Sequence, residues 1–151
     1  PAFTGLGAPY WDADARGAIF GLTRGATRAH IVRACLEAMA FQVYDLLTAM
    51  ESDAEMQLKV LNVDGGASAN SFLMQFESDI LNRNRARPQC TESTALGAAF
   101  LAGLASGFWN SEEEIIGMRS PDDLFVPEES DEWRDERTTT WHDAVSRVRT
   151  R

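Results

Sequence analysis

The sequence predicts an α/β fold in which a layered sheet is flanked by helices. Residues 58–64 alternate apolar and polar side chains and include two valines, which is typical of a strand. Residues 70–82 repeat apolar side chains at helical spacing, so a helix follows that strand. No internal repeat interrupts the alternation of the two patterns. Such alternation favours a sheet whose faces are covered by helices.

The segment before this strand predicts a loop, a strand and a long helix. Residues 3–14 combine glycine, proline and aromatic side chains, which indicates an ordered loop rather than a flexible linker. Residues 17–22 form a short apolar run bounded by glycines, and we expect a buried strand there. Thr27 is a suitable N-cap for a helix that reaches about Glu51. Its apolar residues predict burial over more than one face, with Cys35 in the core.

The segment after residue 82 predicts a short strand followed by three helices. Residues 85–90 read as a strand, and Pro88 indicates a sheet edge or a strand end. Residues 94–105 form a helix of small residues, too short to span a membrane, which we expect to pack tightly in the core. Ser111 and Ser130 are expected to cap a short acidic helix and a final amphipathic helix, with residues 124–127 extended between them.

Composition limits the possible classes of function. The chain has 151 residues, the length of one domain, and a formal net charge of -9. Its basic residues are not gathered into a patch, so we expect no nucleic-acid partner. The two cysteines lack metal-ligand spacing, and no apolar run is long enough for membrane insertion, so we expect a soluble, cytoplasmic protein. Because the chain starts at Pro1 within structured-looking sequence and lacks an initiator Met, we expect a fragment.

The turn between the strand at 58–64 and the helix at 70–82 is the most informative feature. It contains Gly65 and Gly66. Without a Cβ, these residues let a ligand approach the main chain, and the free amides at a helix start favour an anion. Ligands of open α/β sheets bind at such strand ends. The pattern leaves two interpretations open, a nucleotide or phosphate site and a plain tight turn.

Three stretches of the sequence resemble the carboxyl-terminal lobe of the glycerol kinases, within the carbohydrate kinases. They are residues 1–25 (beginning PAFTGLGAPYWD), residues 63–76 (VDGGASANSFLMQF) and residues 94–109 (TALGAAFLAGLASGFW). The resemblance covers the chain to about Trp109. It implies the actin-like ATPase (ribonuclease H-like) fold, with residues 1–151 forming part of the second lobe. The first lobe and the start of the second lobe would then lie outside the chain.

The resemblance also implies an activity and a site. A full-length relative would transfer the γ-phosphoryl group of ATP, with Mg²⁺, to glycerol, giving glycerol 3-phosphate. Gly66 and Asn70 would contact the adenine nucleotide. The family's catalytic aspartate lies before the segment that begins here, so neither a catalytic residue nor a metal ligand is assigned, and the isolated chain is expected to be inactive. The resemblance further implies a homo-oligomer, either a dimer or a tetramer.

Alternatives remain for the function. One is a kinase of the same family that acts on another sugar or polyol. Another is a noncatalytic interaction module that uses the small-residue helix or the acidic tail as its contact surface.

Alternatives also remain for individual residues. Asn70 is equally suited to capping the helix. Asp64 could act as a base or bind magnesium through water, but stabilisation of the turn is the favoured interpretation. Tyr10, Trp11 and Asp12 could contact a ligand, but we expect them to anchor the opening loop to the core. His30 and His142 are too isolated in the sequence to suggest a metal site or an acid–base pair.

Overall fold

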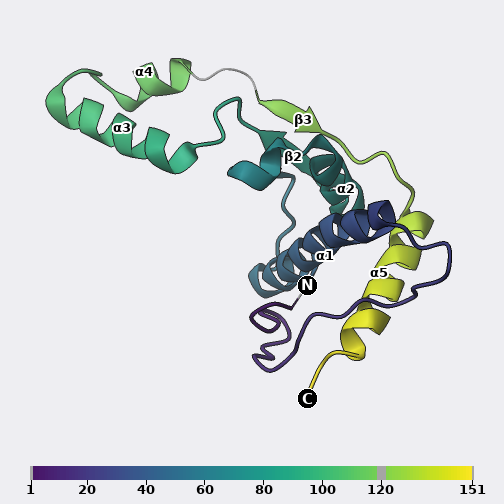
Figure 1. Cartoon of the computed structure of the whole chain (residues 1–151). Helices are drawn as coiled ribbons and strands as arrows, with labels where there is room; N and C mark the ends of the chain where they lie inside the picture. The colour runs from purple at the N-terminus through teal and green to yellow at the C-terminus, as the bar shows by residue number, and fades with distance from the viewer. Residues whose placement is uncertain (1, 119–121, 151) are drawn as a thin grey trace.

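The computed structural model describes residues 2–118 and 122–150 and confirms the α/β prediction. In chain order the elements are α1 (Arg28–Ala54), β1 (Val60–Asn62), the 3₁₀ turn η1 (Gly66–Ala69), α2 (Ser71–Leu81), β2 (Asn84–Arg87), α3 (Ser93–Ser106), α4 (Glu112–Gly117), β3 (Asp123–Phe125) and α5 (Asp131–Ser146). Figure 1 shows α1, α2 and α5 close together beside a small sheet, with α3 and α4 projecting away from them. None of the helices in these described ranges is both long and apolar enough to cross a membrane.

The sheet has the strand order β1-β2-β3. β1 runs parallel to β2, and α2 forms the crossover between them, whereas β3 pairs with β2 in the antiparallel direction. Pro88 lies just past the end of β2, which confirms the predicted strand end. The strand order places β2 in the centre of the sheet rather than at its edge. Because β1 and β2 are parallel, the segments that follow them meet at one edge.

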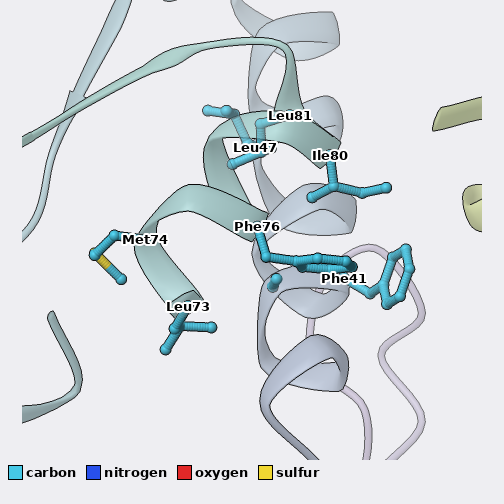
Figure 2. Close-up of a cluster of buried hydrophobic side chains, with 8 residues drawn as sticks. Phe41, Leu47, Leu73, Met74, Phe76, Ile80 and Leu81 are labelled. Carbon is cyan, nitrogen blue, oxygen red and sulfur yellow. The ribbon is translucent and has the colours of Figure 1, made fainter. Parts of the chain in front are cut away.

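The main core lies between α1 and α2 (Figure 2). Phe41 of α1 is 8% exposed and packs edge-on against Phe76 of α2, with ring centroids 5.6 Å apart. The same ring stacks on Trp141 of α5 at 5.3 Å. Three helices from distant parts of the sequence therefore share one aromatic cluster, a favourable arrangement for aromatic side chains. The buried members of this core are Ala40, Phe41, Leu47, Leu73, Met74, Phe76, Ile80 and Leu81.

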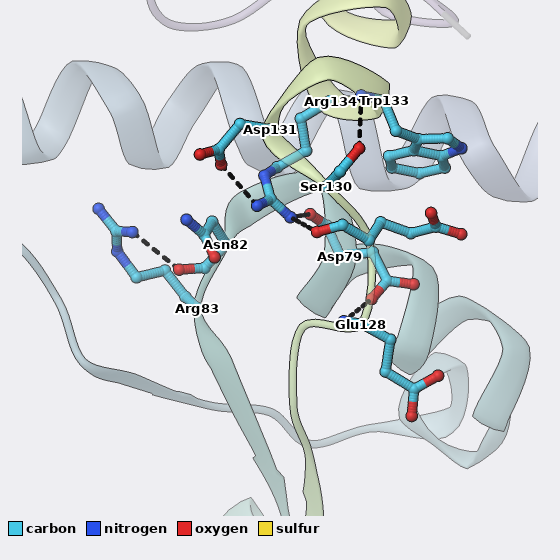
Figure 3. A network of polar contacts seen from close by, with 9 residues as sticks. Asp79, Asn82, Arg83, Glu128, Ser130, Asp131, Trp133 and Arg134 are labelled. Carbon is cyan, nitrogen blue, oxygen red and sulfur yellow. Dashed lines mark hydrogen bonds and ion pairs between the residues drawn. The ribbon is translucent and has the colours of Figure 1, made fainter.

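A polar network fixes the start of α5 against the end of α2 (Figure 3). Arg134 donates through Nη1 to the carbonyl oxygen of Asp79 at 3.1 Å. The backbone N–H of Glu128 donates to Asp79 Oδ1 at 2.9 Å. Ser130 caps α5 as predicted, because its Oγ accepts from the N–H of Trp133 at 3.2 Å. The position of α5 is thus set by hydrogen bonds as well as by aromatic packing.

The carboxylate of Asp45 in α1 connects the opening loop to α5. It is buried and accepts from the Tyr10 hydroxyl at 3.0 Å and from Trp141 Nε1 at 2.7 Å. His142 Nε2 lies 3.0 Å from the other carboxylate oxygen, a pair that was not predicted. Burial and the charge of Asp45 raise the pKa of Tyr10 well above its usual range. Tyr10 therefore anchors the loop, as expected.

Asp12 closes the opening loop on the end of the chain. Its carboxylate is buried and accepts from the N–H of Thr150 at 2.6 Å and from the Thr150 hydroxyl at 2.8 Å. These hydrogen bonds lower the pKa of Asp12. Trp11 between these anchors is 78% exposed, so its predicted anchoring role is wrong. It has a left-handed backbone, with φ of 50°, in a turn that directs its side chain away from the core.

The expected buried strand at residues 17–22 is also wrong. This segment is irregular and exposed, with Ile19 at 60% and Leu22 at 61%. A strand needs a neighbouring backbone for its hydrogen bonds, and none of the described strands pairs with this segment. The adjacent first third of α1 is exposed too, so Cys35 lies on the surface rather than in the core. α1 begins after Thr27 as predicted, but it is buried only within its middle, not over more than one face along its length.

The expected core packing of α3 is wrong as well. The helix lies apart from α1, α2 and α5 (Figure 1), and Gly103 is the only one of its residues, all of them described, that is buried. Leu101 is 72% exposed. The chain turns back after the helix so that Trp109 covers Gly103 and packs against the ring of Phe100 at 5.3 Å. Small side chains offer little apolar area for packing against the core. Trp109, rather than the core, covers the helix at Gly103.

Candidate functional site

The turn after β1 has a shape that depends on glycine and on a buried serine. Gly65 has φ of 77° and ψ of 173°, an extended backbone with positive φ that glycine adopts at little cost. Its N–H donates to the carbonyl oxygen of Thr91 at 2.9 Å. Its own carbonyl accepts from the Ser68 N–H at 3.1 Å and from the Ser68 hydroxyl at 2.7 Å. Ser68 is 2% exposed, so the turn is built into the protein rather than loosely attached.

Gly66 and Asn70, the two predicted contact residues, bracket one short turn. Gly66 begins η1, which was not predicted, and Asn70 follows its last residue. A Cβ built on Gly66 would meet no heavy atom within 4 Å, so the main chain there faces open space. The access that a ligand would need at Gly66 is therefore present.

Asn70 caps α2, which begins at Ser71 rather than at residue 70 as predicted. Its Oδ1 accepts from the N–H of Leu73 at 3.2 Å, and its side chain is exposed. The capping interpretation is thus confirmed. The cap uses the side-chain oxygen, whereas the donors of an asparagine amide are on Nδ2. The cap therefore does not use the amide nitrogen of this side chain.

Arg87, at the end of β2, holds the far end of the turn and was not predicted. Its Nη1 donates to the carbonyl oxygens of Ser68 at 2.9 Å and Ala69 at 3.4 Å, and to the Ser71 hydroxyl at 3.3 Å. Its Nη2 donates to Asp123 at 2.8 Å. The available signal was its position at the end of the strand after the helix, where a parallel partner of the first strand would bring it back to the turn.

A cleft of about 790 Å³ opens beside the turn. It lies at the carboxyl ends of the two parallel strands, and α3 forms its other wall. Open α/β sheets bind their ligands at this position. The lining residues are Asn62, Val63, Asp64, Pro88, Gln89, Cys90, Ser93, Leu96, Gly97, Phe100, Met118 and Asp122.

Asp64 lines this cleft but does not stabilise the turn as expected. Its side chain is exposed, and within residues 2–118 and 122–150 no hydrogen bond to its carboxylate is found. The turn uses the Ser68 hydroxyl for that purpose instead. Over the same described ranges, no cluster of three His, Cys, Asp or Glu side chains is arranged to hold a metal ion.

A comparison with known families matches residues 1–106 to the carboxyl-terminal domain of the FGGY family of carbohydrate kinases. The chain belongs to this family. The matched region contains α1, the glycine turn, the β1–α2–β2 unit and α3. The resemblance inferred from the three sequence stretches is therefore confirmed.

Curated FGGY relatives extend the similarity along almost the whole chain. A glycerol kinase of Desulfitobacterium hafniense is 55% identical over 148 residues, which is 98% of this chain and 30% of the relative. A glycerol kinase of Shewanella pealeana is 58% identical over 149 residues, which is 99% of this chain and 30% of the relative. The chain thus spans about 30% of the length of these relatives, and the similarity continues past Trp109.

Solved structures show the same family fold. A Plasmodium falciparum glycerol kinase crystallised with ADP matches with a TM-score of 0.86 and 42% identity, over 98% of this chain and 30% of that chain. A ligand-bound xylulose kinase of Lactobacillus acidophilus matches with a TM-score of 0.66 and 28% identity, over 95% of this chain and 28% of that chain. The FGGY kinases have the actin-like ATPase fold, so the predicted fold is confirmed.

Proposed function

We propose that residues 1–151 form part of the second lobe of a glycerol kinase, whose full-length form transfers the γ-phosphoryl group of MgATP to glycerol. The observation that carries this proposal is the difference in sequence identity between the chain and kinases named for different substrates. The chain is 42% identical to a glycerol kinase of known structure but 28% identical to xylulose and gluconate kinases. The higher identity to a glycerol kinase therefore supports glycerol as the substrate rather than xylulose or gluconate.

Within that enzyme, Gly66 and Asn70 contact the adenine nucleotide. Three features of the turn support this role: the main chain of Gly66 is uncovered, the side chain of Asn70 is exposed, and its amide nitrogen is left out of the cap. A ligand can reach the peptide of a glycine without meeting a Cβ, and an asparagine amide can donate to a ring nitrogen or to an oxygen. The turn lies at the strand edge where α/β proteins bind nucleotides.

The chain supplies nucleotide binding rather than the complete chemistry. Phosphoryl transfer requires the donor and acceptor to be held in line, with charge stabilised from several sides. We assign no catalytic residue here and expect the base to come from another part of the full-length protein. Mg²⁺ commonly binds one or two carboxylates together with the substrate phosphates, so we expect it to arrive with ATP. The isolated chain should accordingly be inactive as a kinase.

We also propose that the full-length protein is cytoplasmic and forms a dimer or a tetramer, as the resemblance to the glycerol kinases implies. Cell fractionation and light scattering on the purified full-length protein test these two points separately. A membrane-bound enzyme would contradict the first, and a monomer at micromolar concentration would contradict the second.

A substrate panel tests the function. The full-length protein that contains this chain is assayed with ATP and glycerol, xylulose or gluconate as acceptor. We expect the largest kcat/KM for glycerol. Preference for another acceptor would retain the family but refute the glycerol assignment, and no turnover with any acceptor would favour a noncatalytic module.

A pair of tryptophan variants tests the nucleotide site. Gly66→Trp should abolish ADP binding, because the new ring would occupy the open space over the turn. The matched control is Gly117→Trp, since a Cβ at Gly117 also meets nothing within 4 Å. Circular dichroism checks that both variants fold. Equal ADP affinity in the two variants would contradict a nucleotide site at Gly66.

A further inference from the structure

We infer that Arg87 is a positioning residue for nucleotide binding, which acts by holding η1 and Asn70 in place. This inference rests on the proposed contact of Gly66 and Asn70 with the nucleotide. Arg87 does not itself need to touch the ligand. Its Nη1 donates to protein atoms at the end of η1, and the nucleotide is proposed to contact the residues on either side, Gly66 and Asn70.

The contacts of Arg87 are concentrated on the backbone just before Asn70. Nη1 donates to the carbonyl oxygens of Ser68 at 2.9 Å and Ala69 at 3.4 Å, and to the Ser71 hydroxyl at 3.3 Å. Carbonyl groups at the end of a helical turn lack partners within that turn, so an external donor is needed to satisfy them. Asn70 lies between these bonded residues, and its position therefore depends on the guanidinium.

The guanidinium is itself fixed by β3. Asp123, which lies opposite Arg87 in the strand register, accepts from Nη2 at 2.8 Å and from Nε at 3.3 Å. The ring of Phe125 lies under the guanidinium, with its centroid 5.0 Å away. The Arg87 side chain is 16% exposed. A planar fork with donors on both edges can link a carboxylate to backbone carbonyls, which a lysine ammonium cannot do from one point.

Arg87 therefore connects the nucleotide turn to the sheet. Without it, the carbonyl oxygens of Ser68 and Ala69 lose a charged donor, and the end of η1 is free to shift. Such a shift should weaken contacts with the nucleotide and leave acceptor binding unchanged. A purely structural role would instead lower the amount of folded enzyme without changing one KM selectively.

The test uses Arg87→Met, Arg87→Lys and Asp123→Asn in the full-length kinase that contains this chain. For Arg87→Met we expect the KM for ATP and the Kd for ADP to rise by up to roughly tenfold, the loss expected when a displaced Asn70 no longer makes its hydrogen bond to the nucleotide. The KM for glycerol and kcat should stay within about twofold of the parent, close to experimental scatter. Arg87→Lys should restore part of the affinity, and Asp123→Asn should cause a smaller rise. Arg147→Met is the control, because Arg147 pairs with Asp143 on the surface of α5.

An unchanged KM for ATP in folded Arg87→Met would overturn the inference, as would equal rises in the KM values for ATP and glycerol. If Arg87→Met does not fold, the same criteria apply to Arg87→Lys and Asp123→Asn. Gly66→Trp and Asn70→Asp separate the hypothesis of a nucleotide site at the turn from that of a positioning role for Arg87. Parent-like nucleotide affinity in both would refute the proposed site, whereas weakened affinity in both together with a parent-like Arg87→Met would refute the positioning role alone.

Discussion

Replacing Asn70 with aspartate separates the cap that it provides from the nucleotide contact that we propose for it, because the cap uses Oδ1 and the proposed contact uses the amide nitrogen. Oδ1 accepts from the N–H of Leu73 at 3.2 Å and caps α2. Aspartate retains that acceptor but replaces the amide nitrogen with a second carboxylate oxygen. Asn70→Asp should therefore keep the cap and lose the donor to the nucleotide. Asn70→Ala removes both.

The expected magnitudes differ enough to measure. Aspartate and asparagine are about equally good N-caps, whereas alanine costs about 1 kcal/mol of stability. Losing one hydrogen bond to the nucleotide costs about 0.5–1.5 kcal/mol, which raises Kd roughly two- to twelvefold. The carboxylate also repels the phosphates of ADP, so the effect of Asn70→Asp should lie at the upper end of this range.

The assay combines two measurements on the same preparations of the full-length parent protein and its Asn70→Asp and Asn70→Ala variants. Urea unfolding gives the free energy of unfolding, and calorimetric titration gives the Kd for ADP. We expect Asn70→Asp to have parent-like stability and weak ADP binding, and Asn70→Ala to lose both stability and affinity. Parent-like ADP affinity in Asn70→Asp would refute the ligand contact and leave Asn70 as a cap alone.

Three further predictions concern the fold. Phe41→Ala should lower the free energy of unfolding by about 3–5 kcal/mol in urea titrations, because Phe41 is 8% exposed and packs against two other rings; a loss under about 1 kcal/mol would contradict this core. Burial raises the pKa of Glu77, although Arg85 at 2.8 Å opposes the shift. The raised pKa of Glu77 therefore contributes its full stabilisation below the ordinary pKa of 4.5, and this stabilisation is lost as pH rises through the raised pKa. Glu77→Gln should flatten the fall of Tm between these two pKa values. An unchanged dependence of Tm on pH would contradict the shift. Gly103→Ala should displace Trp109, which occupies the place of the new Cβ, and alter the near-ultraviolet circular dichroism; an unchanged spectrum would contradict this packing.

The sequence predicted the features whose interactions are local. Ser130 caps α5 through the N–H three residues ahead, and Asn70 does the same for α2. The glycine turn was predicted for the same reason, since the positive φ of Gly65 is a local backbone conformation that glycine adopts at little cost. Strand and helix positions between residues 58 and 87 were correct within a few residues because periodicity reports them directly.

Burial was predicted less well, because it depends on what lies beside an element. The apolar run at residues 17–22 has the composition of a strand, but no described strand pairs with it, and its side chains remain exposed. The small residues of α3 suggested close packing, but the helix lies away from the core. Composition specifies that a side chain can be buried and does not specify the surface that covers it.

By itself, the sequence determined the family, the α/β class and the turn at Gly65 and Gly66, because each depends on residues that are neighbours in the chain. The tertiary structure alone decided which distant residues contact one another, including the residue that supports that turn. Arg87 reaches Ser68 across 19 positions, and Asp45 binds Trp141 across 96 positions. Both contacts depend on the strand register and on helix packing. A hydrogen bond requires its atoms to meet within about 3 Å, and only the folded chain brings together residues so far apart in sequence.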